Sequence, residues 1–303
     1  MPSDLRTPPG RVVRSGVRQR RENPSGSSVY GAGVPTRLGL LDCIERYFAA
    51  APLPDARIES LGALDVPVGD PAWPYPARPR PGAGSVSEDD VAAAMTLQEA
   101  SGLPVALEWL CERSPEVAAA ARAAGLAVEE LPLLVVDTPV DLLLPHGVRL
   151  LLVGADDPEL PRYQRVAETA FAHPGGPADV GEPPADAAPG ALSGERARVA
   201  ALRERIAAGR TVMMVAVENG APVAVGSHQP VTVDGTEISE VVGVATLPRL
   251  RTRGLGAGLA SALVAHARET ADVVFLTAGD DDVARIYERA GFARLATTGV
   301  ASR

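Results

Sequence analysis

The stretch from Val241 to Glu269, "VVGVATLPRLRTRGLGAGLASALVAHARE", constrains the fold more than any other part of this chain. It runs a β-branched segment into an Arg/Gly-rich turn and then into an Ala/Leu-rich helical pattern. We call residues 251–257 the glycine turn. The first N–H groups of a helix have no intrahelical partner, and they can bind an anion. The glycine turn therefore predicts either a phosphate cradle or only a flexible turn that opens a helix.

Two common phosphate-binding motifs do not fit the glycine turn. A Walker P-loop requires a lysine after its last glycine, but this chain has no lysine, and all 29 of its basic side chains are arginine. A dinucleotide fingerprint requires a third glycine after Gly254 and Gly256, and Leu259 stands at that place. It also requires a βαβ unit, whereas the strand before the turn is predicted to end an antiparallel meander.

The meander prediction depends on two hairpin signals, Asn219-Gly220 and Asp234-Gly235, which separate three β-rich segments. Further elements are expected on both sides, with Asp157 as the N-cap of the first helix. In chain order we expect a strand at 147–154, helices at 157–172 and 193–209, strands at 211–218, 222–231 and 237–246, the glycine turn and its helix, a strand at 272–278, a helix at 280–292 and a strand at 293–300. The Gly/Pro-rich segment 173–191 is expected to be a lid or disordered.

The glycine turn also fits a third pattern, (Q/R)-x-x-G-x-(G/A), over Arg251–Gly256. It thereby resembles the signature of the GNAT superfamily of acyl-CoA-dependent N-acyltransferases. The expected element order is similar to the GNAT fold, and "DDDVARIYERAGF" resembles the family's second signature, N-x-x-A-x-x-L-Y-x-x-x-G-F. The resemblance implies an α/β (α+β) fold over 141–303, with a mixed, mostly antiparallel sheet flanked by helices. A smaller α/β domain over 35–140 and a disordered tail over 1–34 precede it.

The resemblance also implies where acetyl-CoA, the acyl-donor substrate, would bind. The glycine turn would hold the pyrophosphate, with Arg251 and Arg253 adding charge. Backbone groups of the preceding strand would hold the pantetheine and the thioester. The family's asparagine is Asp281 here, which either contacts the ligand or caps its helix. The predicted donor-binding residues are Val244, Ala245, Thr246, Arg251, Thr252, Arg253, Gly254, Leu255, Gly256, Ala257 and Asp281.

Two catalytic residues follow from the same resemblance. Tyr287 falls on the tyrosine that protonates the departing thiolate; the alternative is an aromatic ring that only packs against the sheet. Glu240 lies where histone-acetylating members of the superfamily place a glutamate base. An amine with a pKa near ~10 must lose a proton before it attacks, so a base is useful. Glu240 could equally be a solvated charge at the end of a strand.

The first half contains a faint repeat of the second. A shift of 166 residues overlays Val117 on Val283 and Gly125 on Gly291, and puts Ala121 at the place of Tyr287. Either the first half is a degenerate GNAT-like domain, or two Ala-rich helices align by chance. The aromatic segment "AWPYPARP", with Trp73 and Tyr75, could wall an acceptor pocket or pack as a rigid surface loop.

Composition limits the remaining choices. A net charge of −9 argues against nucleic acid as a partner, and the four histidines lack metal-ligand spacing, so no metal is expected. No apolar run approaches the roughly 18 residues of a membrane span, which favours a cytoplasmic protein. The predicted function is transfer of an acetyl group from acetyl-CoA to a primary amine by direct attack in a ternary complex. The alternative is a non-catalytic acyl-CoA-binding sensor or regulatory module. Neither the acceptor nor the choice between monomer and homodimer follows from the sequence.

Overall fold

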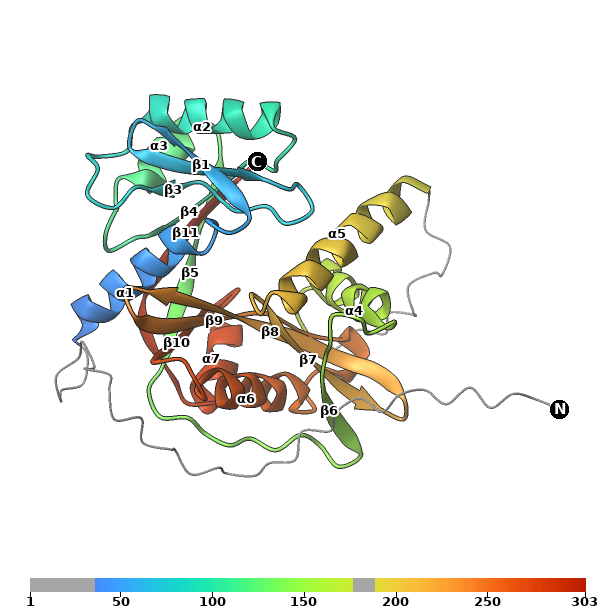
Figure 1. Ribbon diagram of the computed structural model, residues 1–303. Coiled ribbons are helices and arrows are strands. Elements are labelled where there is room, and N and C mark those ends of the chain that lie inside the picture. The colour runs from blue at the N-terminus through green and yellow to red at the C-terminus, as the bar shows by residue number, and fades with distance from the viewer. Residues whose placement is uncertain (1–35, 177–188) are drawn as a thin grey trace.

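The computed structural model describes residues 36–176 and 189–303, which form one large sheet, a small sheet and the helices around them (Figure 1). The expected tail and most of the Gly/Pro-rich segment 173–191 lie outside the described residues. The large sheet has eight strands in the order β4-β11-β5-β10-β9-β8-β7-β6. Every neighbouring pair is antiparallel except β9 and β10. The predicted mixed, mostly antiparallel sheet is therefore confirmed.

The second half follows the expected order of elements. Both hairpin turns have the left-handed backbone that the sequence predicts, with φ of 52° and 82° at Asn219 and Gly220 and 50° and 78° at Asp234 and Gly235. The elements are β6 (Val148–Leu152), α4 (Leu160–Ala172), α5 (Pro189–Ala207), β7 (Val212–Glu218), β8 (Ala221–Val233), β9 (Thr236–Thr246), a 3₁₀ turn η1 (Pro248–Leu250), α6 (Leu255–Ala267), β10 (Val273–Thr277), α7 (Asp281–Arg289) and β11 (Phe292–Ser302).

One predicted cap in this half is wrong. Helix α4 begins at Leu160, not after Asp157, and Glu159 stands at its N-cap without a side-chain cap bond. The Asp157 carboxylate instead accepts a hydrogen bond from the Glu159 backbone N–H at 2.9 Å. Asp157 thus closes a turn before the helix, and Pro161 rather than Pro158 occupies the first helical turn.

Successive side chains of each strand point to opposite faces of the large sheet, and helices cover both faces. Helices α6 and α7 cover one face, where Met214 and Ala216 of β7 meet Leu255, Leu259 and other α6 side chains. Helices α4 and α5 cover part of the other face over Met213 and Val215. Helix α1 (Arg37–Ala50) lies on that same face farther along the sheet, over Val135, Ile238 and Phe275. We call the face under α1, α4 and α5 the front face.

The first half builds a second layer above the end of the large sheet (Figure 1). Its helix α2 begins with a capping box between Ser87 and Asp90, which the sequence "SVSEDD" already indicates. The sequence analysis did not anticipate the three-stranded sheet β1-β2-β3, because its strands are short and interrupted by Pro and Gly. The elements are β1 (Ala56–Leu61), β2 (Leu64–Gly69), β3 (Arg78–Pro79), α2 (Glu88–Ala100), β4 (Ala106–Leu110), α3 (Val117–Ala123) and β5 (Ala127–Val136).

Strands from the two halves alternate within the large sheet. The unit β4-α3-β5 matches the unit β10-α7-β11 element for element, as the 166-residue shift predicts, and Gly125 and Gly291 both have a positive φ after their helix. The units are interleaved: β11 lies between β4 and β5, and β5 lies between β11 and β10. The domain boundary near residue 140 stays a prediction, and strands from both sides of it share one sheet.

The contact between Trp109 and Gly299 tests this interleaving. Gly299 of β11 pairs with Trp109 of β4, and a Cβ added at Gly299 would lie 2.1 Å from the indole ring, which is only 2% exposed. Gly299→Ala should therefore lower the free energy of unfolding by about 1–3 kcal/mol through overpacking. Denaturant unfolding measures this loss. Gly84→Ala is the control, because its Cβ would meet nothing within 4 Å; equal stability of the two variants would contradict the pairing.

Candidate functional site

The two parallel strands of the large sheet separate after Glu240. Strand β9 pairs with β10 only from Ile238 to Glu240, although β9 continues to Thr246. The pairing of β9 with β8 shifts register in this region, where Gly243 has a φ of 63°. Such a bulge bends its strand and re-aims the side chains that follow. Glu240 therefore stands at the vertex of an opening between β9 and β10.

The bulge also changes which β9 side chains reach the front face. Before it, Ile238 packs with α1 on that face. After it, Ala245 packs with α4 and α5, while Val244 packs against the α6 side. The predicted donor-binding stretch 244–246 thus lines the opening, and Thr246 lies beside the glycine turn, with its Oγ1 3.5 Å from where a Cβ at Gly256 would be.

The glycine turn presents open backbone at the start of α6. Gly254 is the N-cap with a φ of 82° and no side-chain cap, and Thr252 also has a positive φ of 64°. Within the described part of the chain, the backbone N–H groups of residues 252–257 have no acceptor, and the first bond runs from the Gly258 N–H to the Gly254 carbonyl at 3.0 Å. A Cβ at Gly254 would meet nothing within 4 Å. Free N–H groups, open space and a helix N-terminus suit an anion such as a pyrophosphate.

Both arginines of the glycine turn have partners inside the protein. Arg251 donates to the carbonyls of Ala170 at 2.7 Å and Gly175 at 2.8 Å, and so caps the end of α4. Arg253 makes a bidentate ion pair with Glu218 at 2.6 and 3.0 Å. These contacts hold the turn against α4 and β7. Direct contact of either guanidinium with a bound ligand stays a prediction.

Tyr287 lies on the α6 side of the sheet, in the second turn of α7. Its ring is 8% exposed and packs edge-on against Phe292 at 5.8 Å. Burial raises the pKa of its hydroxyl well above the usual value, so the phenol is neutral. Among the described residues the hydroxyl has no hydrogen-bond partner, so its proton is free to be donated to a ligand.

Asp281 is paired within the protein. The α7 N-cap is its neighbour Asp280, whose carboxylate accepts from the Val283 N–H at 2.7 Å. Asp281 forms an ion pair with Arg294 of β11. The capping role considered for Asp281 therefore belongs to Asp280, and a ligand contact by Asp281 stays a prediction.

A pocket of about 270 Å³ opens on the front face at Glu240. We call it the Glu240 pocket. It lies between α1 and the segment 72–78, so Trp73 and Tyr75 wall it, as one of the two interpretations of the aromatic segment predicts. Its lining residues are Tyr47, Ala51, Ala72, Trp73, Pro74, Tyr75, Arg78, Glu108, Gln229 and Glu240.

Burial and, to a smaller extent, the neighbouring Glu108 carboxylate raise the pKa of Glu240 to about 8, although Arg78 and the Tyr47 hydroxyl act in the opposite direction. Glu240 is only partly exposed, and it faces the pocket. A carboxyl group with such a pKa exchanges protons close to neutral pH. This is the range that a general base requires.

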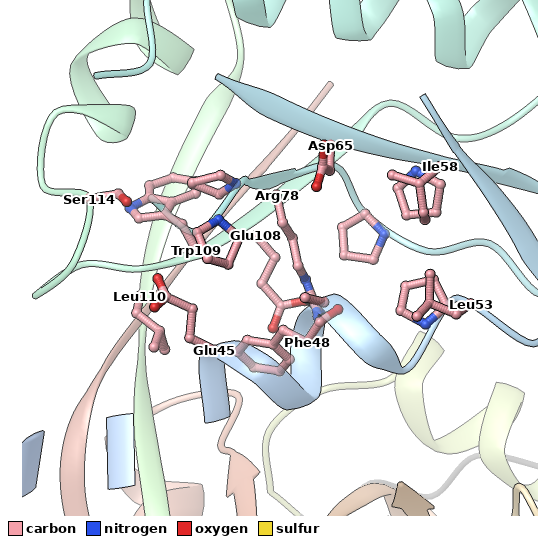
Figure 2. Close-up of a pocket in the computed structure, with 16 residues that line it drawn as sticks. Glu45, Phe48, Leu53, Ile58, Asp65, Arg78, Glu108, Trp109, Leu110 and Ser114 are labelled. Carbon is pink, nitrogen blue, oxygen red and sulfur yellow. Dashed lines mark hydrogen bonds and ion pairs between the residues drawn. The ribbon is translucent and has the colours of Figure 1, made fainter. Parts of the chain in front are cut away.

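Arg78 and Glu108 form a partly buried ion pair at 2.6 Å that lines the Glu240 pocket. Figure 2 shows the same two side chains in the wall of a second pocket, which has a volume of about 130 Å³. There the Arg78 side chain extends past Glu108 to the Phe48 ring, and proline side chains form much of the wall. The pair thus separates the two pockets. Sequence reasoning missed Glu108, although a single acid inside the apolar strand "VALEWL" was a signal.

The comparisons with known proteins agree with this geometry. The model of the Acetyltransferase (GNAT) family matches residues 186–292, which contain β7 to α7 with the glycine turn. Residues 186–292 form a GNAT domain. This match supports acyl transfer in general, and it supplies neither the acceptor nor the roles of single residues. No curated protein matches the chain.

Two solved structures resemble the chain beyond the GNAT domain. A GCN5-related N-acetyltransferase from Kribbella flavida is 21% identical, with a TM-score of 0.60 over 90% of this chain and 96% of that one. A putative GNAT-family acetyltransferase from Novosphingobium aromaticivorans is 18% identical, with a TM-score of 0.51 over 84% and 93%. Both likenesses include the first half, so its fold is also found in GNAT proteins. Within the described residues no helix is long and apolar enough to cross a membrane, and no group of three or more metal-ligating side chains occurs.

The raised pKa of Glu240 has a consequence for stability. Its folded value of about 8 exceeds the unfolded value of 4.5, so the folded protein binds a proton that the unfolded chain releases between those pH values. The stability that Glu240 contributes is therefore present below pH 4.5 and lost as the pH rises through 8. As the pH rises from 5 to 8, the Tm of Glu240→Gln should therefore decrease less than the Tm of the parent. The exposed Glu269→Gln is the control, and parallel curves for parent and Glu240→Gln would contradict the shift.

Proposed function

We propose that this protein transfers an acetyl group from acetyl-CoA to a primary amine. The observation that carries the proposal is the position of Glu240. Its titratable carboxyl group faces a pocket and lies at the point where β9 and β10 separate. The donor would enter from the glycine turn and the acceptor from the Glu240 pocket. Their reactive groups would then meet at one point between the two sites.

Free backbone groups would form the donor side of the site. Residues 252–257 would bind the pyrophosphate through their N–H groups, and β9 residues 244–246 would hold the pantetheine along the strand edge that β10 leaves unpaired. No group in the described chain accepts from the N–H groups of residues 252–257, and along β9 the edge opposite β8 has no strand partner after Glu240. A bound donor would supply the missing partners.

The reaction would be a direct attack. The amine nitrogen forms a bond to the thioester carbonyl carbon, and the carbon–sulfur bond breaks. Glu240 takes the proton that the amine loses, and Tyr287 gives a proton to the leaving thiolate, so charge and atoms balance. Free N–H groups of β9 could stabilise the oxyanion that forms in between. A sensor that binds acyl-CoA without turnover would need neither Glu240 nor Tyr287, and release of free CoA in the presence of an amine separates the two functions.

Gly256→Val tests the pyrophosphate cradle. Gly256 is helical and has no positive φ, and the added Cβ would make only an ordinary contact with Thr246, so the variant should fold. Its side chain would nevertheless fill the approach to the N–H groups, and CoA affinity should fall roughly tenfold or more, about 1.4 kcal/mol. Calorimetry with CoA measures this change. Ala265→Val in the exposed part of α6 is the control, and unchanged affinity in Gly256→Val would mean that the glycine turn is only a turn.

Tyr287→Phe tests the proton donor. The variant keeps the ring and its packing on Phe292, and because the hydroxyl has no partner among the described residues, stability should hardly change. Loss of a general acid should lower kcat by roughly 10²–10⁴ at nearly unchanged CoA affinity. Tyr163→Phe on α4 serves as the matched control. A kcat within about threefold of the parent would assign the proton to water or to the acceptor itself.

A further inference from the structure

The Glu240 pocket has an acidic end and an apolar end. Glu240 and Glu108 form the acidic end, and the rest of the wall is mainly uncharged, with Ala51, Ala72, Trp73, Pro74 and Tyr75. A volume of about 270 Å³ lies at the lower limit for small-molecule sites, so the pocket suits a compact ligand. A flat ring can lie against aromatic side chains in stacked or edge-on arrangements.

Arg78 is the single cation among the residues that line the pocket, and its two terminal nitrogens are engaged while its Nε is buried. Its Nη2 donates to Glu108 at 2.6 Å, and its Nη1 donates to the Phe48 carbonyl at 3.2 Å. The guanidinium also lies 3.8 Å above the centre of the Phe48 ring. A carboxylate brought into the pocket would therefore face Glu108 and Glu240 without a free cation.

The aromatic wall is fixed from behind by a buried ion pair. Arg205 of α5, which is 4% exposed, pairs with Asp55 and donates to the Tyr75 hydroxyl at 2.7 Å. The Tyr75 hydroxyl donates to Asp55 at 2.7 Å, and burial raises its pKa to about 12, so it stays neutral. The Arg205 guanidinium lies 4.4 Å from the Trp73 ring. The wall is thus ordered before a ligand arrives, which reduces the entropic cost of binding.

We propose that the acceptor is a compact primary amine with an uncharged, ring-bearing body and no carboxylate. Its amine lies at Glu240 and its ring lies on the wall of Trp73 and Tyr75. This assignment rests on the acetyl transfer proposed above. A free amino acid fits less well, because its carboxylate would be desolvated in a pocket whose single cation is already paired with Glu108. A diamine also fits less well, because Arg78 already neutralises Glu108 and leaves no unpaired anion for a second ammonium.

Matched pairs of ligands test the proposal on the full chain. Phenethylamine and tyramine differ from phenylalanine and tyrosine by one carboxylate, and 1,5-diaminopentane carries a second ammonium without a ring. Calorimetry in the presence of CoA gives the affinities. The two arylalkylamines should bind about a hundredfold or more tightly than the amino acids, because the carboxylate of an amino acid would lose its water without gaining a cation as partner. The proposal is overturned if the amino acids or the diamine bind as tightly as the arylalkylamines or more tightly. It is also overturned if neither arylalkylamine binds at millimolar concentration.

Two substitutions locate the recognition in the pocket. Trp73→Ala should raise KM for phenethylamine roughly tenfold at similar kcat, and Trp73→Phe should restore it, because a ring replaces a ring. Glu108→Gln frees Arg78 for a carboxylate and should narrow the preference for phenethylamine over phenylalanine. An unchanged preference in Glu108→Gln, or an unchanged KM in Trp73→Ala, contradicts recognition by this wall.

The same measurements separate this proposal from the function on which it rests. If arylalkylamines bind with the expected preference but cause no release of CoA from acetyl-CoA, the result contradicts the acetyl transfer and supports the proposed class of ligand. CoA release with amino acids and not with arylalkylamines supports the acetyl transfer and overturns the ligand class.

Discussion

The separation of β9 from β10 after Glu240 is the constraint on which the site depends. Parallel strands normally stay paired over their full length, because every unpaired N–H and C=O costs free energy away from water. Here the bulge at Gly243 ends the pairing while both strands continue. The sheet thereby gains an internal edge without losing its outer strands, and the glycine turn lies at the far end of that edge. A substrate that pairs with this edge would replace the missing strand contacts.

The first half contributes directly to this site. Its segment 72–78, its Glu108 and its helix α1 surround Glu240, although the GNAT-family match lies entirely in the second half. The buried pair of Arg205 and Asp55 connects the two halves behind the aromatic wall. Removing one partner of such a pair leaves a buried charge uncompensated, so the connection holds geometry more than it adds stability. The first half, which lacks a counterpart of Tyr287, thus shapes the pocket at Glu240.

The sequence predicted the second half well because its signals are local. Each of these signals is encoded within a few residues: the Asn-Gly and Asp-Gly turns, the glycine turn, and the Ala/Leu-rich pattern of α6. The structure has all of them. The sequence offered Trp73 and Tyr75 as one possible wall, but it could not predict that Tyr47, Glu108 and Glu240 join them, because these residues meet only through tertiary packing. The three strands β1 to β3 were missed for a related reason: Gly and Pro interrupt their pattern. The interleaved order of β4, β11, β5 and β10 also depends on pairing between distant segments, for which one sequence carries no signal.

This interleaving affects how the chain can fold during its synthesis. Strands β4 and β5 leave the ribosome early, yet the strand that lies between them, β11, is made only after the whole GNAT domain. Ala301 of β11 is fully buried in the same cluster as Leu107 and Trp109, so the first half cannot complete its core until then. Meanwhile β4 and β5 present unpaired edges, which favour wrong pairing and aggregation. The first half is therefore synthesised first but completes its core last, after β11 has been inserted between its two strands.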